Sequence, residues 1–207
     1  MKYLLLTITV GTLETNCYIY ADAVSREAFI IDPGDDAVEI IDAVKKNNLV
    51  PKAIINTHGH WDHIGANREI QHVFSIPLYV HKDETEFLTT PGLNGSSLIG
   101  GSNIPSPTAD STLRDGQTLS LGSLVLTVIH TPGHTPGGMC LMTEDLLFTG
   151  DTLFCGSVGR CDLPGGDENL LMASLKKLRL LPSSLTILPG HGPACVLEKE
   201  FKHNPYL

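Results

Sequence analysis

Residues 57–63 read THGHWDH and follow directly on a short apolar run. Three imidazoles and one carboxylate in so short a stretch suit neither a helix nor a strand, but they are ligands that zinc, iron and similar metals prefer. In an extended or tightly turned loop alternate side chains point the same way, so His58 and His60 are placed to share one ion. Asp62 and His63 then point toward a second position beside it. The stretch predicts a loop that holds two metal ions close together.

The composition of the chain excludes several classes of protein. With 207 residues, 42% of them hydrophobic, the chain can bury a sizeable core in one domain. A formal net charge of −9 argues against a nucleic-acid partner, because phosphate backbones attract basic proteins. No apolar run approaches the roughly 20 residues that span a bilayer, which argues against a membrane partner. Residues 1–10 predict a first β-strand rather than a signal peptide.

The cysteines predict a reducing compartment. Their number is odd and no two of them form a C-x-x-C pair, which suits reduced thiols better than a disulfide framework. We therefore expect a cytoplasmic protein whose five cysteines are free thiols: Cys17, Cys140, Cys155, Cys161 and Cys195.

Short apolar runs alternate with stretches of helical spacing along the whole chain. In the first half we expect strands at 28–31, 53–55 and 76–80 and helices at 37–47 and 64–74. In the second half we expect strands at 124–129, 146–151 and 185–188 and a helix at 168–181. The apolar face of the helix at 37–47 is expected to be Val38, Ile41 and Val44, and that of the helix at 168–181 to be Leu171, Leu175 and Leu178.

Each half runs strand–helix–strand and ends in a loop of glycine and histidine, so the two halves resemble each other. This repetition predicts an α/β fold in which two sheets pack face to face with helices outside, and ligand loops meet along one edge. The halves comprise approximately residues 1–88 and 111–207 of a single domain. Residues 89–110 are rich in Gly, Ser, Pro and Asn and predict a linker or a flap over the site.

Two metal ions need more ligands than one loop can supply. His134, Asp151 and His191 each follow an expected strand and sit beside glycines, which let the backbone approach a ligand closely. Because all three stand at matching strand ends, we expect them to complete the site.

The order of these ligands resembles the metallo-β-lactamase superfamily. Residues 31–34 (IDPG), 150–154 (GDTLF) and 159–167 (GRCDLPGGD) further resemble the glyoxalase II-like hydrolases, which are hydroxyacylglutathione hydrolases. The resemblance covers nearly the whole chain and implies an αββα sandwich with the metal site at one edge of its two sheets. It implies that Asp151 bridges two ions, one held by His58, His60 and His134 and the other by Asp62, His63 and His191.

Two divalent cations about 3.5–4 Å apart can share a hydroxide and generate it at neutral pH. Zinc is the first expectation for both ions, with iron or manganese as alternatives. We hypothesise that the hydroxide attacks the carbonyl of a thioester, with Asp62 as the catalytic residue that orients it. A thiolate whose pKa is near ~8.5 leaves without strong acid help, which accounts for the lack of an obvious acid residue.

The substrate is less well defined by the sequence than the metal site. In glyoxalase II proper, a Lys and a Tyr in the loop after the bridging Asp help to bind the glutathione thioester, and a helical C-terminal domain adds contacts. Arg160 and Asp162 stand at the equivalent spacing here, and the chain stops 16 residues after His191, so we expect no such domain. Arg160 either clamps a substrate carboxylate or pairs with Asp162 to shape the loop.

Other readings of the same residues stay open. A persulfide dioxygenase of this fold would bind one iron through His58, His134 and Asp151, with open positions for O₂. Hydrolysis of another ester, a lactone or a β-lactam would use the two-metal site unchanged. A non-catalytic metal-binding module fits less well, because a structural zinc site needs only four ligands.

Overall fold

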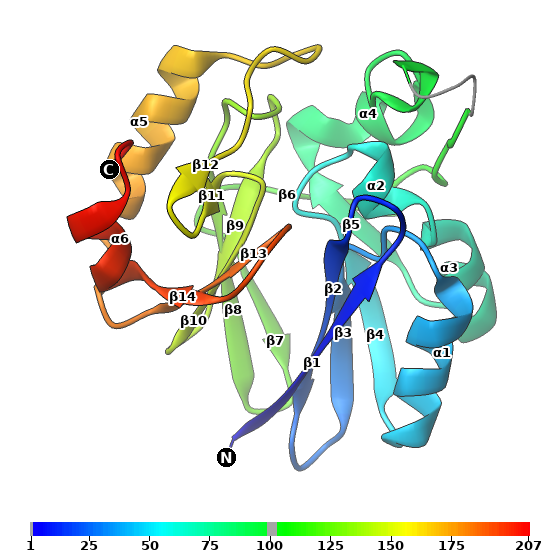
Figure 1. Ribbon diagram of the computed structural model, residues 1–207. Helices are drawn as coiled ribbons and strands as arrows, with labels where there is room; N and C mark the ends of the chain where they lie inside the picture. Colours follow the sequence, from blue (N-terminus) through cyan, green and yellow to red (C-terminus); the bar gives the residue numbers. More distant parts are fainter. Residues whose placement is uncertain (1, 99–102) are drawn as a thin grey trace.

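The computed structural model describes residues 2–98 and 103–207 and contains two six-stranded sheets that face each other (Figure 1). The first sheet consists of β1 (Tyr3–Val10), β2 (Thr15–Asp22), β3 (Glu27–Ile31), β4 (Val50–Ile55), β5 (Leu78–His81) and β6 (Ser111–Leu113). The strands lie in this order, antiparallel from β1 to β3 and parallel from β3 to β6. Because β6 belongs to this sheet, the chain passes to the second sheet after Leu113 and not before residue 111.

The second sheet also has six strands, but only one of its strand pairs is parallel. It consists of β14 (Cys195–Val196), β13 (Thr186–Pro189), β10 (Leu146–Gly150), β9 (Met139–Met142), β8 (Leu124–His130) and β7 (Thr118–Leu121), written in their spatial order. Strands β7 to β10 are antiparallel, and β10 pairs with β13 in parallel. A small hairpin of β11 (Leu153–Phe154) and β12 (Ser157–Val158) follows β10.

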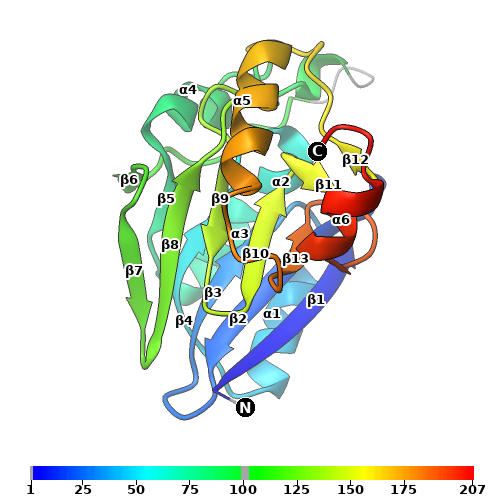
Figure 2. The same cartoon turned by 90° about the vertical axis from the view of Figure 1, so that its left-hand side faces the viewer.

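Helices cover the outer face of each sheet, which confirms the αββα sandwich. Helices α1 (Ala37–Lys46) and α3 (Asn67–Phe74) pack on the first sheet. Helices α5 (Glu168–Leu178) and α6 (Leu197–His203) pack on the second, and in Figure 2 α5 stands in front of the region of β9 while α6 lies to its right, near β13. Shorter turns lie in the loops: α2 (Trp61–Ile64), η1 (Lys82–Glu84), α4 (Thr85–Thr89) and η2 (Ser96–Leu98). No helix in the described ranges is long and apolar enough to cross a bilayer.

The central core lies between the two sheets. Tyr18 on β2 and Phe148 on β10 meet edge to face across this interface, with ring centroids 5.3 Å apart. Ile31 and Ile55, each fully buried, line the same layer from the first sheet. Since a fully buried side chain of this size contributes roughly 1.5–3 kcal/mol, the facing sheets are held mainly by apolar burial.

The two longest helices differ in how well their apolar faces follow from sequence. Helix α5 buries Leu171, Leu175 and Leu178, as expected. Helix α1 buries Ala37, Ile40 and Val44, whereas Val38 is 70% exposed, so the expected face was wrong by part of a turn. A strict three-residue step drifts around a helix of 3.6 residues per turn, and Ile40 with Val44 is the true i, i+4 pair.

The connecting segment 89–110 is held against the first half where the structure describes it. The backbone N–H of Trp61 donates to the carbonyl of Asn94 over 3.0 Å. The backbone N–H of Ser106 donates to the carbonyl of Leu88 in α4 over 2.8 Å. The expected linker or flap also includes residues 99–102, which lie outside the described residues.

One prediction about the cysteines was wrong, because Cys155 and Cys195 form a disulfide. The pair joins the loop after β11 to the start of β14, 40 residues apart in sequence. The two loops become neighbours only once β10 has paired with β13, so the sequence holds no local sign of the bond. Cys17, Cys140 and Cys161 are free, as expected.

Candidate metal centre

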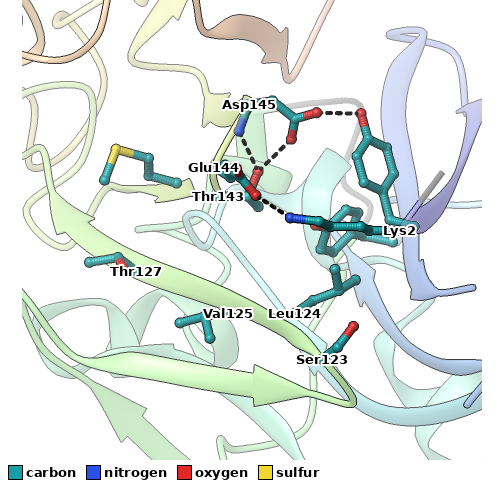
Figure 3. Close-up of a pocket in the computed structure, with 11 residues that line it drawn as sticks. Lys2, Ser123, Leu124, Val125, Thr127, Thr143, Glu144 and Asp145 are labelled. Carbon is teal, nitrogen blue, oxygen red and sulfur yellow. Dashed lines mark hydrogen bonds and ion pairs between the residues drawn. The ribbon is translucent and has the colours of Figure 1, made fainter.

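One hollow lies near the N-terminus, at the end of the sandwich opposite to the histidine loop, and Figure 3 shows the residues that line it. It is an open groove of 830 Å³. Its charged and hydroxyl side chains bind one another: the Lys2 ammonium donates to Glu144 over 2.9 Å, and the Tyr3 hydroxyl donates to Asp145 over 3.0 Å. These groups already satisfy each other, whereas the His and Asp side chains that could hold metal ions converge at the other end of the sandwich.

All seven predicted metal ligands lie in loops at that other end. The loop after β4 carries four of them, and the loop between β8 and β9 carries His134. Asp151 directly follows β10, and His191 follows β13. These loops come from both sheets and meet where the sheets come together, at the top of Figure 1.

The first cluster consists of His58, His60 and His134, whose ring nitrogens lie within 4.8 Å of one another. The Nδ1 of His60 is 2.8 Å from the Nε2 of His134. All three side chains are nearly fully buried. This close group of three imidazoles matches the ligand set expected for one ion.

The second cluster consists of Asp62, His63 and His191, whose ligand atoms also lie within 4.8 Å of one another. The Oδ2 of Asp62 is 3.4 Å from the Nε2 of His63 and 3.2 Å from the Nε2 of His191. The two ring nitrogens are 3.3 Å apart. This triangle of two nitrogens and one oxygen fits a single cation at its centre.

Asp151 lies between the clusters and contacts both. Its Oδ2 is 3.6 Å from the Nε2 of His134 in the first cluster and 3.5 Å from the Nε2 of His191 in the second. Its Oδ1 is 3.4 Å from the Nε2 of His63. Because Oδ2 lies near a histidine of each cluster, Asp151 stands where a carboxylate that bridges two neighbouring cations would be expected.

The unpaired polar atoms of the site also fit two metals. The Nε2 of His58 and the Oδ1 of Asp151 are buried and have no hydrogen-bond partner among the described residues. Leaving such a group unsatisfied costs about 1–3 kcal/mol, so buried polar atoms normally have partners. Cations held by the two clusters would supply the missing partners of these atoms.

The protonation states differ between the clusters. Burial lowers the pKa of His58 well below its usual range and the pKa of His60 to about 3. Both rings are therefore neutral near pH 7 and keep a lone pair for a cation. Burial opposes the charge on His191, but Asp151 and Asp62 outweigh it and raise the pKa of His191 to about 10. A cation that binds there must displace a proton.

Backbone carbonyls orient two of the histidines, and sequence reasoning missed both. The Nδ1 of His134 is 2.7 Å from the carbonyl of Arg160, and the Nδ1 of His191 is 3.0 Å from the carbonyl of Leu13. With Nδ1–H donating to a carbonyl, each ring turns its Nε2 lone pair toward the site. Every residue type carries a backbone carbonyl, so the sequence cannot show which carbonyl will contact a histidine.

Two side chains outside the predicted set also support the ligands. The Thr15 hydroxyl donates to Asp62 Oδ2 over 3.1 Å. The buried carboxylate of Asp32 lies 3.1 Å from His63 Nδ1 and accepts hydrogen bonds from the Thr57 backbone N–H (2.7 Å) and hydroxyl (2.6 Å). The IDPG motif at residues 31–34 could have indicated Asp32, because β3 lies beside β4 and ends at the same edge of the sheet.

Arg160 and Asp162, the predicted substrate-binding residues, form a two-pronged ion pair. The Nε and Nη2 of Arg160 donate to the two carboxylate oxygens of Asp162 over 2.6 and 2.7 Å. Both side chains are mostly exposed, and the Arg160 carbonyl contacts His134. The loop-shaping role is thus present in the structure, beside the first cluster.

Two further histidines differ from a simple surface role. His81 is buried and stacks on His130 with ring centroids 3.9 Å apart. A ring nitrogen of His130, Nε2, lies 2.9 Å from the backbone carbonyl of Pro136.

The comparisons with known proteins agree with this geometry. A family model described as the metallo-beta-lactamase superfamily matches residues 10–191. The chain belongs to the metallo-β-lactamase superfamily. The probable metallo-hydrolase YqgX of Bacillus subtilis is 36% identical over 96% of this chain and 94% of its own length. The hydroxyacylglutathione hydrolase GloC of Haemophilus influenzae is 33% identical over 97% of this chain and 96% of its own.

Solved structures of the superfamily share the whole architecture. The B3 metallo-β-lactamase BLEG-1 is 42% identical with a TM-score of 0.94, and the match covers 99% of both chains. The protein TTHA1623, solved in a di-iron-bound form, is 35% identical with a TM-score of 0.87 over 98% of this chain and 100% of that one. With the two ligand clusters, these relatives make the chain a metal-dependent hydrolase of the superfamily with a site for two metals.

Proposed function

We propose that this chain hydrolyses thioesters of the S-lactoylglutathione type at a dinuclear zinc centre, with iron or manganese as alternative metals. The observation that carries the proposal is the position of Asp151 between two clusters of three ligands each. The similarity to GloC, which is named a hydroxyacylglutathione hydrolase, supports the choice of a thioester.

The proposed role of Asp62 follows from its contacts. When bound, two divalent ions lower the pKa of water to near neutrality and polarise the carbonyl of an acyl substrate. The Oδ2 of Asp62 faces His63 and His191 and accepts a hydrogen bond from Thr15, so this oxygen is the one that faces the second ion. Its Oδ1 is left to accept a hydrogen bond from the attacking water and orient it.

Arg160 and Asp162 are the proposed substrate-binding residues. Asp162 accepts hydrogen bonds from the Nε and Nη2 of Arg160, and the guanidinium has further N–H groups on a mostly exposed side chain. A glutathione moiety carries carboxylates that these donors can bind. The thiolate that leaves has a pKa near ~8.5, so the site needs no strong general acid.

Hydrolysis of β-lactams is the second candidate. It is favoured by the similarity to BLEG-1, which is named a B3 metallo-β-lactamase. The leaving group of a β-lactam is an amine nitrogen that needs a proton, and Arg160, whose backbone carbonyl contacts His134, is the cationic residue of the GRCDLPGGD loop. Guanidinium is a poor proton donor because its pKa exceeds 12, which favours the thioester.

The two candidates separate in one experiment. The zinc-loaded protein is assayed with S-lactoylglutathione and with a chromogenic cephalosporin. We expect thioester hydrolysis with kcat/KM of at least about 10⁴ M⁻¹s⁻¹ and much slower opening of the cephalosporin. The opposite ranking would favour β-lactam hydrolysis. A protein purified with a single iron that cleaves neither substrate, but consumes O₂ with glutathione persulfide, would be a dioxygenase instead.

A further inference from the structure

Glu84 is a fully buried carboxylate close to the metal ligands but not one of them. It ends the turn η1, between β5 and α4, and its exposed fraction is 0%. Its Oε1 accepts the backbone N–H of Gly59 over 2.9 Å, and its Oε2 accepts the backbone N–H of Gly137 over 2.7 Å. No Lys or Arg in the described part of the chain forms an ion pair with it.

The two amides belong to the two loops that supply the first cluster. Gly59 stands between His58 and His60, in the loop after β4 of the first sheet. Gly137 stands three residues after His134, in the loop between β8 and β9 of the second sheet. The carboxylate of Glu84 therefore joins, through one rigid group of atoms, loops that come from opposite sheets.

The fit around Glu84 is tight. A Cβ atom at Gly137 would lie 2.7 Å from both the backbone N and the Oε2 of Glu84, and one at Gly59 would lie 2.6 Å from Phe87 Cβ. These distances are shorter than real Cβ contacts, so only glycine permits both backbones to approach the carboxylate. The glycines and the glutamate thus form one unit.

Burying this group is costly for the fold. Burial raises the pKa of Glu84 to about 7, because removal of a carboxylate from water disfavours its charged form. No cationic side chain of the described residues offsets this cost, so the carboxylate is held in its buried position by the two backbone N–H groups that it accepts. Residues that are unfavourable for stability in this way usually occur where they serve a functional site.

We propose that Glu84 is a positioning residue that sets the distance between the His58–His60 loop and His134, and thereby the metal affinity of the first cluster. The proposal rests on the two-metal centre described above. It predicts a local effect: the second cluster of Asp62, His63 and His191 makes no contact with Glu84 and keeps its affinity.

The test measures zinc affinity at each cluster separately after the substitution Glu84→Gln. A His191→Ala background leaves the first cluster intact, and a His60→Ala background leaves the second. In Glu84→Gln one amide oxygen replaces two acceptors, so one glycine N–H faces an NH₂ group. We expect affinity at the first cluster to fall about 10–100-fold, as for other groups that hold metal ligands in place. Affinity at the second cluster stays unchanged.

A matched control exists at the opposite end of the molecule. Asp22 is also buried and also joins the two sheets, because its Oδ2 accepts the Ser123 N–H over 2.9 Å while its Oδ1 accepts the Ser25 N–H over 2.8 Å. Asp22→Asn should leave zinc affinity at both clusters as in the wild type. If Glu84→Gln does not fold, Glu84→Asp keeps the charge but reaches only one amide, and the same loss at the first cluster is expected.

Three results would overturn the proposal: wild-type affinity at the first cluster in Glu84→Gln, an equal loss at both clusters, or an equal loss in Asp22→Asn. The failure of the proposed function gives a different result. In that case the wild-type chain itself binds zinc and responds to Glu84→Gln as expected, yet does not hydrolyse the thioester.

Discussion

Replacing Gly190 by alanine would insert a methyl group between two proposed metal ligands. The added Cβ would lie 2.7 Å from the Cε1 of His63 and would overlap the Oδ1 of Asp151. Gly190 does not have a positive φ, so alanine imposes no backbone strain there, and the collision is the whole perturbation. His63 belongs to the second cluster and Asp151 contacts both, so the substitution acts on the centre directly.

The size of the effect follows from these distances. Ordinary van der Waals contact begins at 3.4 Å, so the Cε1 of His63 must move away from the new Cβ by about 0.7 Å and the Oδ1 of Asp151 must move further. Metal–ligand bonds tolerate roughly 0.2 Å, so neither ligand can keep its bond. A misplacement of about 1 Å in an active site can cost on the order of 100-fold in rate. We expect zinc affinity and kcat/KM in Gly190→Ala to fall at least that far.

The assay is a zinc titration against a competing chelator, followed by thioester hydrolysis on the same sample. Gly192→Ala in the same loop is the control, because its Cβ meets nothing within 4 Å. Its φ of +75° makes alanine strained by roughly 1 kcal/mol or more, so it tests loop destabilisation without a collision. Equal zinc affinity and rate in the two variants would refute the assignment of Asp151 and His63 as ligands.

Three further predictions address other parts of the account. Asp151→Asn should lower both the metal content and the rate of hydrolysis, by more than the roughly 10–100-fold that is typical of a group that only supports a ligand. A variant with normal metal content and a normal rate would show that another residue bridges the two ions. Arg160→Ala should raise KM for the glutathione thioester at unchanged metal content, and an unchanged KM would leave only the loop-shaping pair with Asp162. Burial, with the nearby ring of His130, lowers the pKa of His81 from 6.5 to about 4. Between these two pH values the folded chain therefore binds fewer protons at His81 than the unfolded chain does. Denaturant titrations should show that the free energy of unfolding falls as the pH is lowered from about 6.5 to about 4, and His81→Gln should reduce this fall.

The candidate site could be predicted largely because its signals are local. His58, His134, Asp151 and His191 each follow an apolar run and stand beside glycine, and parallel strands deliver such loops to one edge. The residue types alone then indicate a metal centre. The strand positions followed for the same reason, since a short apolar run between turn residues is a local pattern.

Long-range relations could not be read from the sequence in this way. The Cys155–Cys195 bond depends on two loops that approach only after β13 has joined the second sheet. Glu84 sits in an unremarkable KDE turn, and its partners are backbone amides 25 and 53 residues away. The face of α1 was misjudged because Val38 fits an apolar pattern but points to solvent. In each case tertiary packing, rather than local pattern, decides the outcome.

The central claim is that seven side chains from four loops form one centre for two metal ions. Its most direct test is the metal stoichiometry of the full chain, determined by elemental analysis after zinc loading and dialysis. The account predicts two equivalents of zinc per chain, falling to about one when His191 in the second cluster is replaced by alanine. A wild-type chain that retains one equivalent or none would contradict it.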